Sequence, residues 1–230
     1  VARGAVGVVG LRSRLDQKRY SWKRVSENAG VRPGMSWINL SGDAANYFPE
    51  LQGGATINVP PAEALFSQCV KASGDINCVF LRYFNPVGAH ISGMNGELPK
   101  GRPNNLVPVV TQFASGWVDD LVVHGTDYET RDGTAIRDYI HVSDIAHAHV
   151  LALEYLNTKK AASNYDVFNL GSGNGVTVLE VLRAFEKVSS LKLDYQLGPR
   201  REGDVEMIYA DNSKATSLLN WELQFGIEDA

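Results

Sequence analysis

The sequence predicts an α/β fold, because strand and helix signals alternate along the chain after about residue 60. The clearest strand, residues 78–84, is a run of apolar and β-branched side chains that ends at Asn85 and Pro86. The clearest helix start is Thr177, since Glu180 follows at the spacing of a capping box. Ligands of open α/β sheets bind beyond the carboxyl ends of strands, so Asn85 and His90 are expected near a ligand. The alternative is an ordinary exit from the strand, with Asn85 capping its own turn.

The other elements follow in order from apolar periodicity and from helix and turn signals. Helices are expected at residues 61–71, 104–116, 143–156, 178–185 and 213–220. Strands are expected at residues 78–84, 121–124, 139–142 and 165–170. His149 lies in the apolar stripe of the third helix, and His147 points to a different face. We therefore expect a packing histidine there and no metal site.

Composition places the chain among ordinary globular proteins. Its 230 residues, 44% hydrophobic and 21% charged, suit one large domain or two small ones. No apolar run approaches about 18 residues, so no membrane span is expected. No charged-then-apolar leader is seen, so no signal peptide is expected, and the chain is expected in the cytoplasm. Cys69 and Cys78 lack the spacing of a zinc site and are expected to be reduced packing residues.

The net charge of −4 is unevenly distributed along the chain. Residues 1–60 hold eight basic and four acidic residues, a net charge of +4, whereas the remainder holds 14 basic and 22 acidic residues, or −8. The basic part contains no block of five or six like charges. A solvated surface explains it better than an arm that binds nucleic acid, and no nucleic-acid partner is expected.

Four longer stretches carry a family resemblance. They read LRYFNPVGAH at residues 81–90, PNNLVP at 103–108, DYETRDGTAIRDYIHV at 127–142 and GPRREGD at 198–204. In this order and spacing they resemble UDP-glucose (UDP-galactose) 4-epimerases of the extended short-chain dehydrogenase class, over residues 75–230. The resemblance implies the C-terminal part of a Rossmann-like fold with a substrate-binding subdomain. Residues 1–74 would then be an incomplete or divergent nucleotide-binding region.

The same resemblance implies an NAD-dependent isomerase that interconverts UDP-glucose and UDP-galactose through hydride transfer at C4 of the sugar, as a homodimer. Two alternatives stay open. One is another NAD-dependent nucleotide-sugar epimerase or dehydratase, although the PNNLVP and DGTAIRDYIHV stretches favour the first. The other is a non-catalytic nucleotide-sugar-binding or truncated product.

The residue types in these stretches suit a UDP-sugar. Asn104 and Asn105 stand at an expected helix start, where free N–H groups favour phosphate oxygens. Arg137 and Arg201 offer guanidinium forks that match phosphate. Asp204 would accept ribose hydroxyls or fix Arg201. Without the resemblance, a surface salt bridge between Arg137 and its neighbour Asp138 would be the default interpretation.

Carried over residue by residue, the resemblance assigns the substrate contacts as follows. Asn85 would contact the sugar or pyrophosphate, Asn105 the pyrophosphate and Leu106 the uridine. The diphosphate would be bound by Arg137 and Arg201, and the ribose by Asp204. The uracil slot would be lined by Val122, Val123 and His124, the last of which is usually Phe in the family. Ile208 would line the 2-position of the sugar, where a bulky Tyr excludes N-acetyl groups.

The cofactor and catalytic positions are less complete. Tyr83 and Pro86 would lie near the nicotinamide of NAD. Gly4, Gly7 and Gly10 have the GxxGxxG spacing of the family's NAD turn, although no strand leads into it and a chance match stays open. The family's Tyr-x-x-x-Lys pair, in which the lysine lowers the tyrosine pKa, does not occur before Leu81. The catalytic residues are therefore unassigned.

Overall fold

The computed structural model of the chain describes residues 5–12, 67, 70–71, 76–99, 101, 103–158 and 164–230, of which residues 5–12 and 76 are described by backbone alone. Contacts divide the described residues into two units, and the division passes through one helix, α5 (Val142–Asn157). The first unit holds Tyr83–His147 and Asn169–Ala230. The second holds the described residues up to Arg82 together with Ala148–Phe168. The domain boundary predicted after residue 74 lies outside the described residues and stays a prediction.

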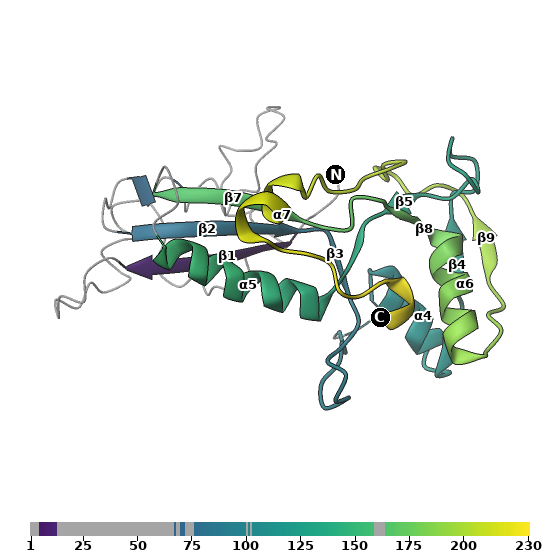
Figure 1. Cartoon of the computed structure of the whole chain (residues 1–230). Helices are drawn as coiled ribbons and strands as arrows, with labels where there is room; N and C mark the ends of the chain where they lie inside the picture. Colours follow the sequence, from purple (N-terminus) through teal and green to yellow (C-terminus); the bar gives the residue numbers. More distant parts are fainter. Residues whose placement is uncertain are drawn as a thin grey trace. The chain divides into compact units, whose positions relative to one another are not determined.

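The second unit contains a three-stranded sheet (Figure 1). Its order is β1 (Ala5–Arg12), β2 (Ile76–Tyr83) and β7 (Tyr165–Leu170). From Cys78 to Leu81 every side chain of β2 is at most 2% exposed, because a central strand covered on both faces is apolar throughout. The strand predicted at residues 78–84 is confirmed, although it starts earlier, at Ile76, and ends at Tyr83. The prediction for β7 is confirmed with identical bounds.

A small apolar cluster lies against this sheet in the second unit. Val70, Cys78 and Phe80 are buried in it, and Tyr165 and Val167 pack against them. Burial raises the pKa of the Cys78 thiol to about 12, so the thiol stays protonated and unreactive. The predicted packing role of Cys78 is confirmed, whereas Cys69 lies outside the described residues. Tyr155 of α5 donates a hydrogen bond to Asp166 at 2.8 Å, which ties the helix to β7.

The first unit contains three pairs of short strands. Two pairs are parallel, β3 (Asn85–Val87) with β6 (Tyr139–His141) and β4 (Val122–His124) with β9 (Gln196–Gly198). The third pair, β5 (Ile136–Arg137) with β8 (Val176–Thr177), is antiparallel. Around them lie α4 (Leu106–Ala114), α6 (Val178–Ser189), α7 (Ser213–Leu219) and the 3₁₀ turn η2 (Ile227–Asp229). Figure 1 shows α4, α6 and η2 close together.

The capping box predicted at the start of α6 is present. The Thr177 side chain accepts from the Glu180 N–H at 3.1 Å, and the Glu180 carboxylate accepts from the Thr177 N–H at 2.9 Å. The apolar face of α6 then enters a core built from Val110, Leu121, Val123, Leu182 and Leu193. This core supports the ends of β4 and α4, which carry several of the predicted site residues.

Two features differ from the sequence predictions. Helix α4 begins at Leu106 because Asn105 is its N-cap, with extended dihedrals of φ −87° and ψ 147°. The expected glycine turn is wrong at Gly7 and Gly10, which lie inside β1, where neighbouring valines favour extended backbone and β2 supplies the ladder partner. Gly4 lies outside the described residues. Within the described part of the chain, no helix is long and apolar enough to cross a membrane, and no three potential metal ligands cluster.

Candidate functional site

Two arginines from separate parts of the first unit share one carboxylate. Arg137 of β5 donates from Nη2 to Asp204 Oδ1 at 3.0 Å and from Nη1 to its neighbour's carbonyl, Ile136 O, at 2.8 Å. Arg201 donates from Nε to Asp204 Oδ2 at 3.1 Å. The side chain of Arg137 is 13% exposed and that of Arg201 is 56% exposed. The Asp204 carboxylate therefore holds one sheltered and one accessible guanidinium group. Guanidinium groups of this kind bind anions that carry several oxygens.

Asp204 fixes both arginines in this arrangement. Fixing Arg201 was one of the two roles expected of Asp204 from the sequence. Its N–H also donates to Arg201 O at 3.2 Å, which closes the tight turn between the two residues. The default interpretation, a surface salt bridge between Arg137 and Asp138, is wrong because Asp138 is fully buried. Arg137 is instead directed to a carboxylate 67 residues further along the chain.

A polar network at the start of α6 fixes the position of β5. Asp132 accepts hydrogen bonds from the Thr134 N–H at 3.0 Å and hydroxyl at 2.7 Å, and from the Thr177 hydroxyl at 2.5 Å. Arg131 pairs with the Glu180 carboxylate, which holds the pKa of Glu180 down at about 2. These bonds join the residues before β5 to β8 and α6, so the strand carrying Arg137 is held against β8.

The neighbouring Arg200 has a different environment from Arg201. Its Nε donates to Asp127 Oδ1 at 2.7 Å, and its guanidinium carbon lies 4.1 Å from the centre of the Tyr128 ring. The hydrogen bond from Arg200 lowers the pKa of Asp127. Arg200 therefore joins two loops, and Arg201 is the arginine of this stretch that remains available to a ligand.

The predicted uracil slot falls on the β4–β9 pair. Val123 is buried in the core, so only its backbone can face a ligand, while Val122 and His124 point to the opposite side of the strand. Gly198 lies against these two side chains, since a Cβ there would come within 2.8 Å of Val122 Cγ1. His124 Nδ1 lies 3.3 Å from Pro199 O. The strand pair thus brings the polar edge of His124 to the start of the GPRREGD stretch.

The start of α4 has the features of an anion site. Asn104 and Asn105 are both exposed, and the Asn105 side chain makes no capping hydrogen bond to the helix. The first turn contains no acidic residue, so its N–H groups and positive dipole end are not neutralised there. Leu106 packs into the core beneath, which fixes the turn.

Asn85 and Pro86 lie in β3, directly beside β6. The Asn85 N–H donates to Asp138 O at 3.0 Å, and Pro86 pairs in register with Ile140. Tyr83 is partly buried, and burial raises its phenol pKa, so the hydroxyl is neutral at physiological pH. Tyr83 thus suits a hydrogen-bond donor rather than a tyrosinate base.

Ile208 is held against the strand of Arg137. Its N–H donates to Ile136 O at 3.2 Å, and it is partly buried. Asn85, Arg137, Asp204 and Ile208 are therefore linked through residues 136–139. Sequence reasoning missed the residue at the centre of these links, Asp138; the one available signal was the Gly171-Ser172-Gly173 turn after β7, whose N–H groups suit a carboxylate.

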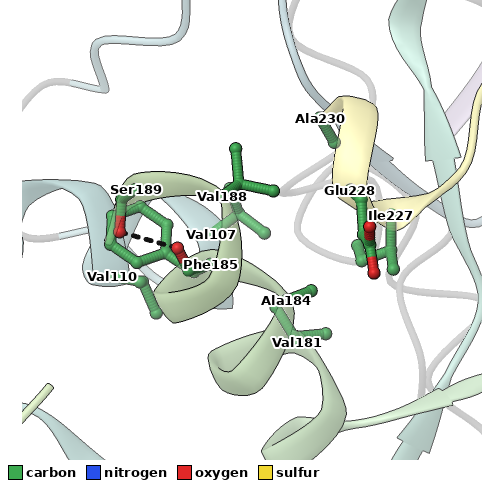
Figure 2. Close-up of a pocket in the computed structure, with 10 residues that line it drawn as sticks. All are labelled: Val107, Val110, Val181, Ala184, Phe185, Val188, Ser189, Ile227, Glu228 and Ala230. Atoms are coloured by element: carbon green, nitrogen blue, oxygen red, sulfur yellow. Dashed lines mark hydrogen bonds between the residues drawn. The ribbon is translucent and has the colours of Figure 1, made fainter. Parts of the chain in front are cut away.

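An apolar pocket of about 100 Å³ lies elsewhere in the first unit, between α4, α6 and η2. Figure 2 shows Val107, Val181 and Ile227 among the side chains that line it. None of the predicted site residues is among its lining residues. Its size and apolar walls do not suit a charged nucleotide, so it is separate from the candidate site.

The solved structures to which this chain is similar have the extended short-chain dehydrogenase, or Rossmann-like, fold, and this chain covers the C-terminal part of it. Residues 62–171 match the model of the NAD dependent epimerase/dehydratase family. A UDP-glucose 4-epimerase of Erwinia amylovora is 46% identical over 167 residues, which are 73% of this chain and 49% of that protein. The chain therefore contains an NAD dependent epimerase/dehydratase family domain over residues 62–171.

Two solved structures show the same fold. A UDP-glucose-4-epimerase of Stenotrophomonas maltophila, with bound NAD and formylated UDP-arabinopyranose, is 40% identical with a TM-score of 0.70 over 77% of this chain and 54% of that one. A UDP-glucose 4-epimerase of Bifidobacterium longum, in complex with NAD+ and UDP, is 44% identical with a TM-score of 0.66 over 74% of this chain and 49% of that one. The chain spans about half the length of the relatives it matches.

Proposed function

We propose that this chain forms the substrate-binding part of an NAD-dependent UDP-glucose 4-epimerase. The observation that carries the proposal is the pair Arg137 and Arg201 on the Asp204 carboxylate. A UDP-sugar carries a diphosphate between uridine and sugar, and two guanidinium forks match its oxygens. The three similar proteins described above are each named UDP-glucose 4-epimerase, which supports the same substrate.

The remaining predicted residues complete the proposed binding mode. The start of α4, with Asn105 and Leu106, receives the pyrophosphate and uridine. Val122, the Val123 backbone and His124 take the uracil, and Asn85 contacts the sugar or pyrophosphate. Asp204 orients the arginines and presents its remaining lone pairs to the ribose. Ile208 lies at the 2-position of the sugar.

NAD is the proposed cofactor. Bound NAD would supply reversible hydride transfer at C4 of the sugar. Tyr83 and Pro86 fit a position near the nicotinamide, because Tyr83 is a neutral donor at the end of β2 and Pro86 follows in β3. Gly7 and Gly10 do not fit the phosphate turn, since both lie in β1. No proton-transfer step is assigned, because the sequence has no Tyr-x-x-x-Lys pair before Leu81.

Calorimetry of the 230-residue chain with UDP and with uridine tests the proposal. Two charge-assisted contacts should make UDP bind at least about tenfold more tightly than uridine. Equal affinities would show that no diphosphate site exists. NAD released from the purified, denatured chain separates the epimerase and its NAD-dependent relatives from a non-catalytic nucleotide-sugar binder, which would release none. A cytoplasmic homodimer is the proposed assembly, to be tested by cell fractionation and light scattering.

A further inference from the structure

A buried carboxylate lies at the centre of the first unit. Asp138 is 0% exposed and has no cation among the partners that its four hydrogen bonds record. Oδ1 accepts from the Ser172 N–H and hydroxyl, both at 2.7 Å. Oδ2 accepts from the Gly173 N–H at 3.2 Å and the Ala210 N–H at 2.9 Å. Each carboxylate oxygen of Asp138 therefore accepts two hydrogen bonds, and the four donors come from two loops that are distant in the sequence.

The loop after β7 is shaped to let this carboxylate approach. A Cβ at position 171 would overlap Asp138 Oδ2, so Gly171 is required there. Gly173 has a φ of +75°, a conformation that directs its N–H toward the carboxylate and favours glycine. A carboxylate and three backbone N–H groups thus form one rigid contact.

Asp138 also connects four proposed ligand-binding residues. Arg137 precedes it in the chain, and the Asn85 N–H donates to its carbonyl at 3.0 Å. Its bond to the Ala210 N–H holds the end of the segment that contains Asp204 and Ile208. Residue 138 is therefore bonded to β3 and to the segment that contains Asp204 and Ile208, and it directly follows Arg137.

We infer that Asp138 is a positioning residue. Its carboxylate fixes residue 138 to the loop of Ser172 and to Ala210, and its backbone thereby holds Arg137 and Asn85 beside the segment of Asp204 in the arrangement that binds the diphosphate. This inference rests on the proposed function. Asparagine cannot replace Asp138, because each carboxylate oxygen accepts two hydrogen bonds and three of the four donors are backbone N–H groups. An amide NH₂ would meet at least one N–H in either orientation and leave a buried donor unpaired.

The test compares Asp138→Asn with a matched control, Asp144→Asn. Asp144 is also 0% exposed and accepts backbone N–H groups, from Gln224 at 3.1 Å and Phe225 at 3.2 Å. It holds a segment that contains none of the proposed ligand residues. Calorimetry with UDP and with uridine on each folded variant separates loss of the diphosphate arrangement from general loss of stability.

Asp138→Asn should weaken UDP binding by about tenfold and uridine binding by less than about twofold, whereas Asp144→Asn should leave the ratio of the two affinities unchanged. If Asp138→Asn fails to fold, Ser172→Ala removes the 2.7 Å hydroxyl bond to Asp138, together with the 3.2 Å bond that the hydroxyl accepts from the Asn174 N–H in the same turn. It should still shift the ratio, by about twofold to fivefold. An unchanged ratio in both variants, or an equal shift in Asp144→Asn, would overturn the inference. A parent chain that does not prefer UDP over uridine would instead refute the proposed function itself.

Discussion

Replacing Arg201 by alanine should weaken UDP binding without unfolding the first unit. The substitution removes the accessible guanidinium group, while Asp204 keeps its 3.0 Å hydrogen bond from Arg137. A hydrogen bond to a charged group contributes about 1.5 to 3 kcal/mol. Because the Arg201 side chain is 56% exposed, solvent screening places the loss near the lower end. A loss of about 1.5 kcal/mol corresponds to about a tenfold rise in the Kd for UDP.

Calorimetry with UDP measures this change, and Arg200→Ala is the matched control. The two arginines are adjacent and lose the same formal charge, but Arg200 is already engaged by Asp127 at 2.7 Å and by the Tyr128 ring. Arg200→Ala should therefore lower stability more than affinity. Unchanged UDP affinity in folded Arg201→Ala would remove the GPRREGD stretch from the site. An equal loss in both variants would indicate a nonspecific charge effect.

Three further predictions concern acid stability, sugar selectivity and turnover. Glu180→Gln should lose on the order of 1 kcal/mol of unfolding free energy at pH 7, a value limited by solvent screening of a side chain that is about one-third exposed. Because pairing with Arg131 depresses the Glu180 pKa from 4.5 to about 2, this difference should persist above pH 4.5 and shrink toward pH 2 in urea titrations. UDP-N-acetylglucosamine should bind with a Kd within about tenfold of that of UDP-glucose, since Ile208 is smaller than tyrosine. In competition binding, Ile208→Tyr should weaken the acetylated ligand alone. Equal weakening of both ligands would show that Ile208 is a packing residue. In a coupled assay, the chain should interconvert UDP-glucose and UDP-galactose at least about a thousandfold more slowly than a complete enzyme, because no Tyr-x-x-x-Lys pair occurs before Leu81, where the resembling family has it. Full activity would reveal another general base.

Elements with local signals were predictable from the sequence. The α6 capping box depends on residues three positions apart, and β7 is bounded by its own apolar run and the glycines that follow. The short strands β3, β5, β8 and β9 were missed because each has two or three residues and exists through pairing with a distant strand. No local pattern specifies such a partner.

The site was predictable in its residue types but not in its internal contacts. The sequence places two arginines side by side at positions 200 and 201, and only the fold shows that Arg200 is held by a partner 73 residues away. Asp138 follows Arg137 directly, which suggests a pair, yet its carboxylate binds donors 34 to 72 residues away. Long-range hydrogen bonds of this kind follow from the topology rather than from spacing along the chain.

Hydrogen exchange of the 230-residue chain with and without UDP tests the central claim, that the first unit binds the diphosphate through Arg137 and Arg201. Ligand contacts slow the opening of the backbone they touch. We predict slower exchange with UDP in peptides that cover β5, β6 and residues 198–204, and no change in α7 (Ser213–Leu219). Protection that is absent from both arginine-bearing segments, or that appears in α7 alone, would contradict the account.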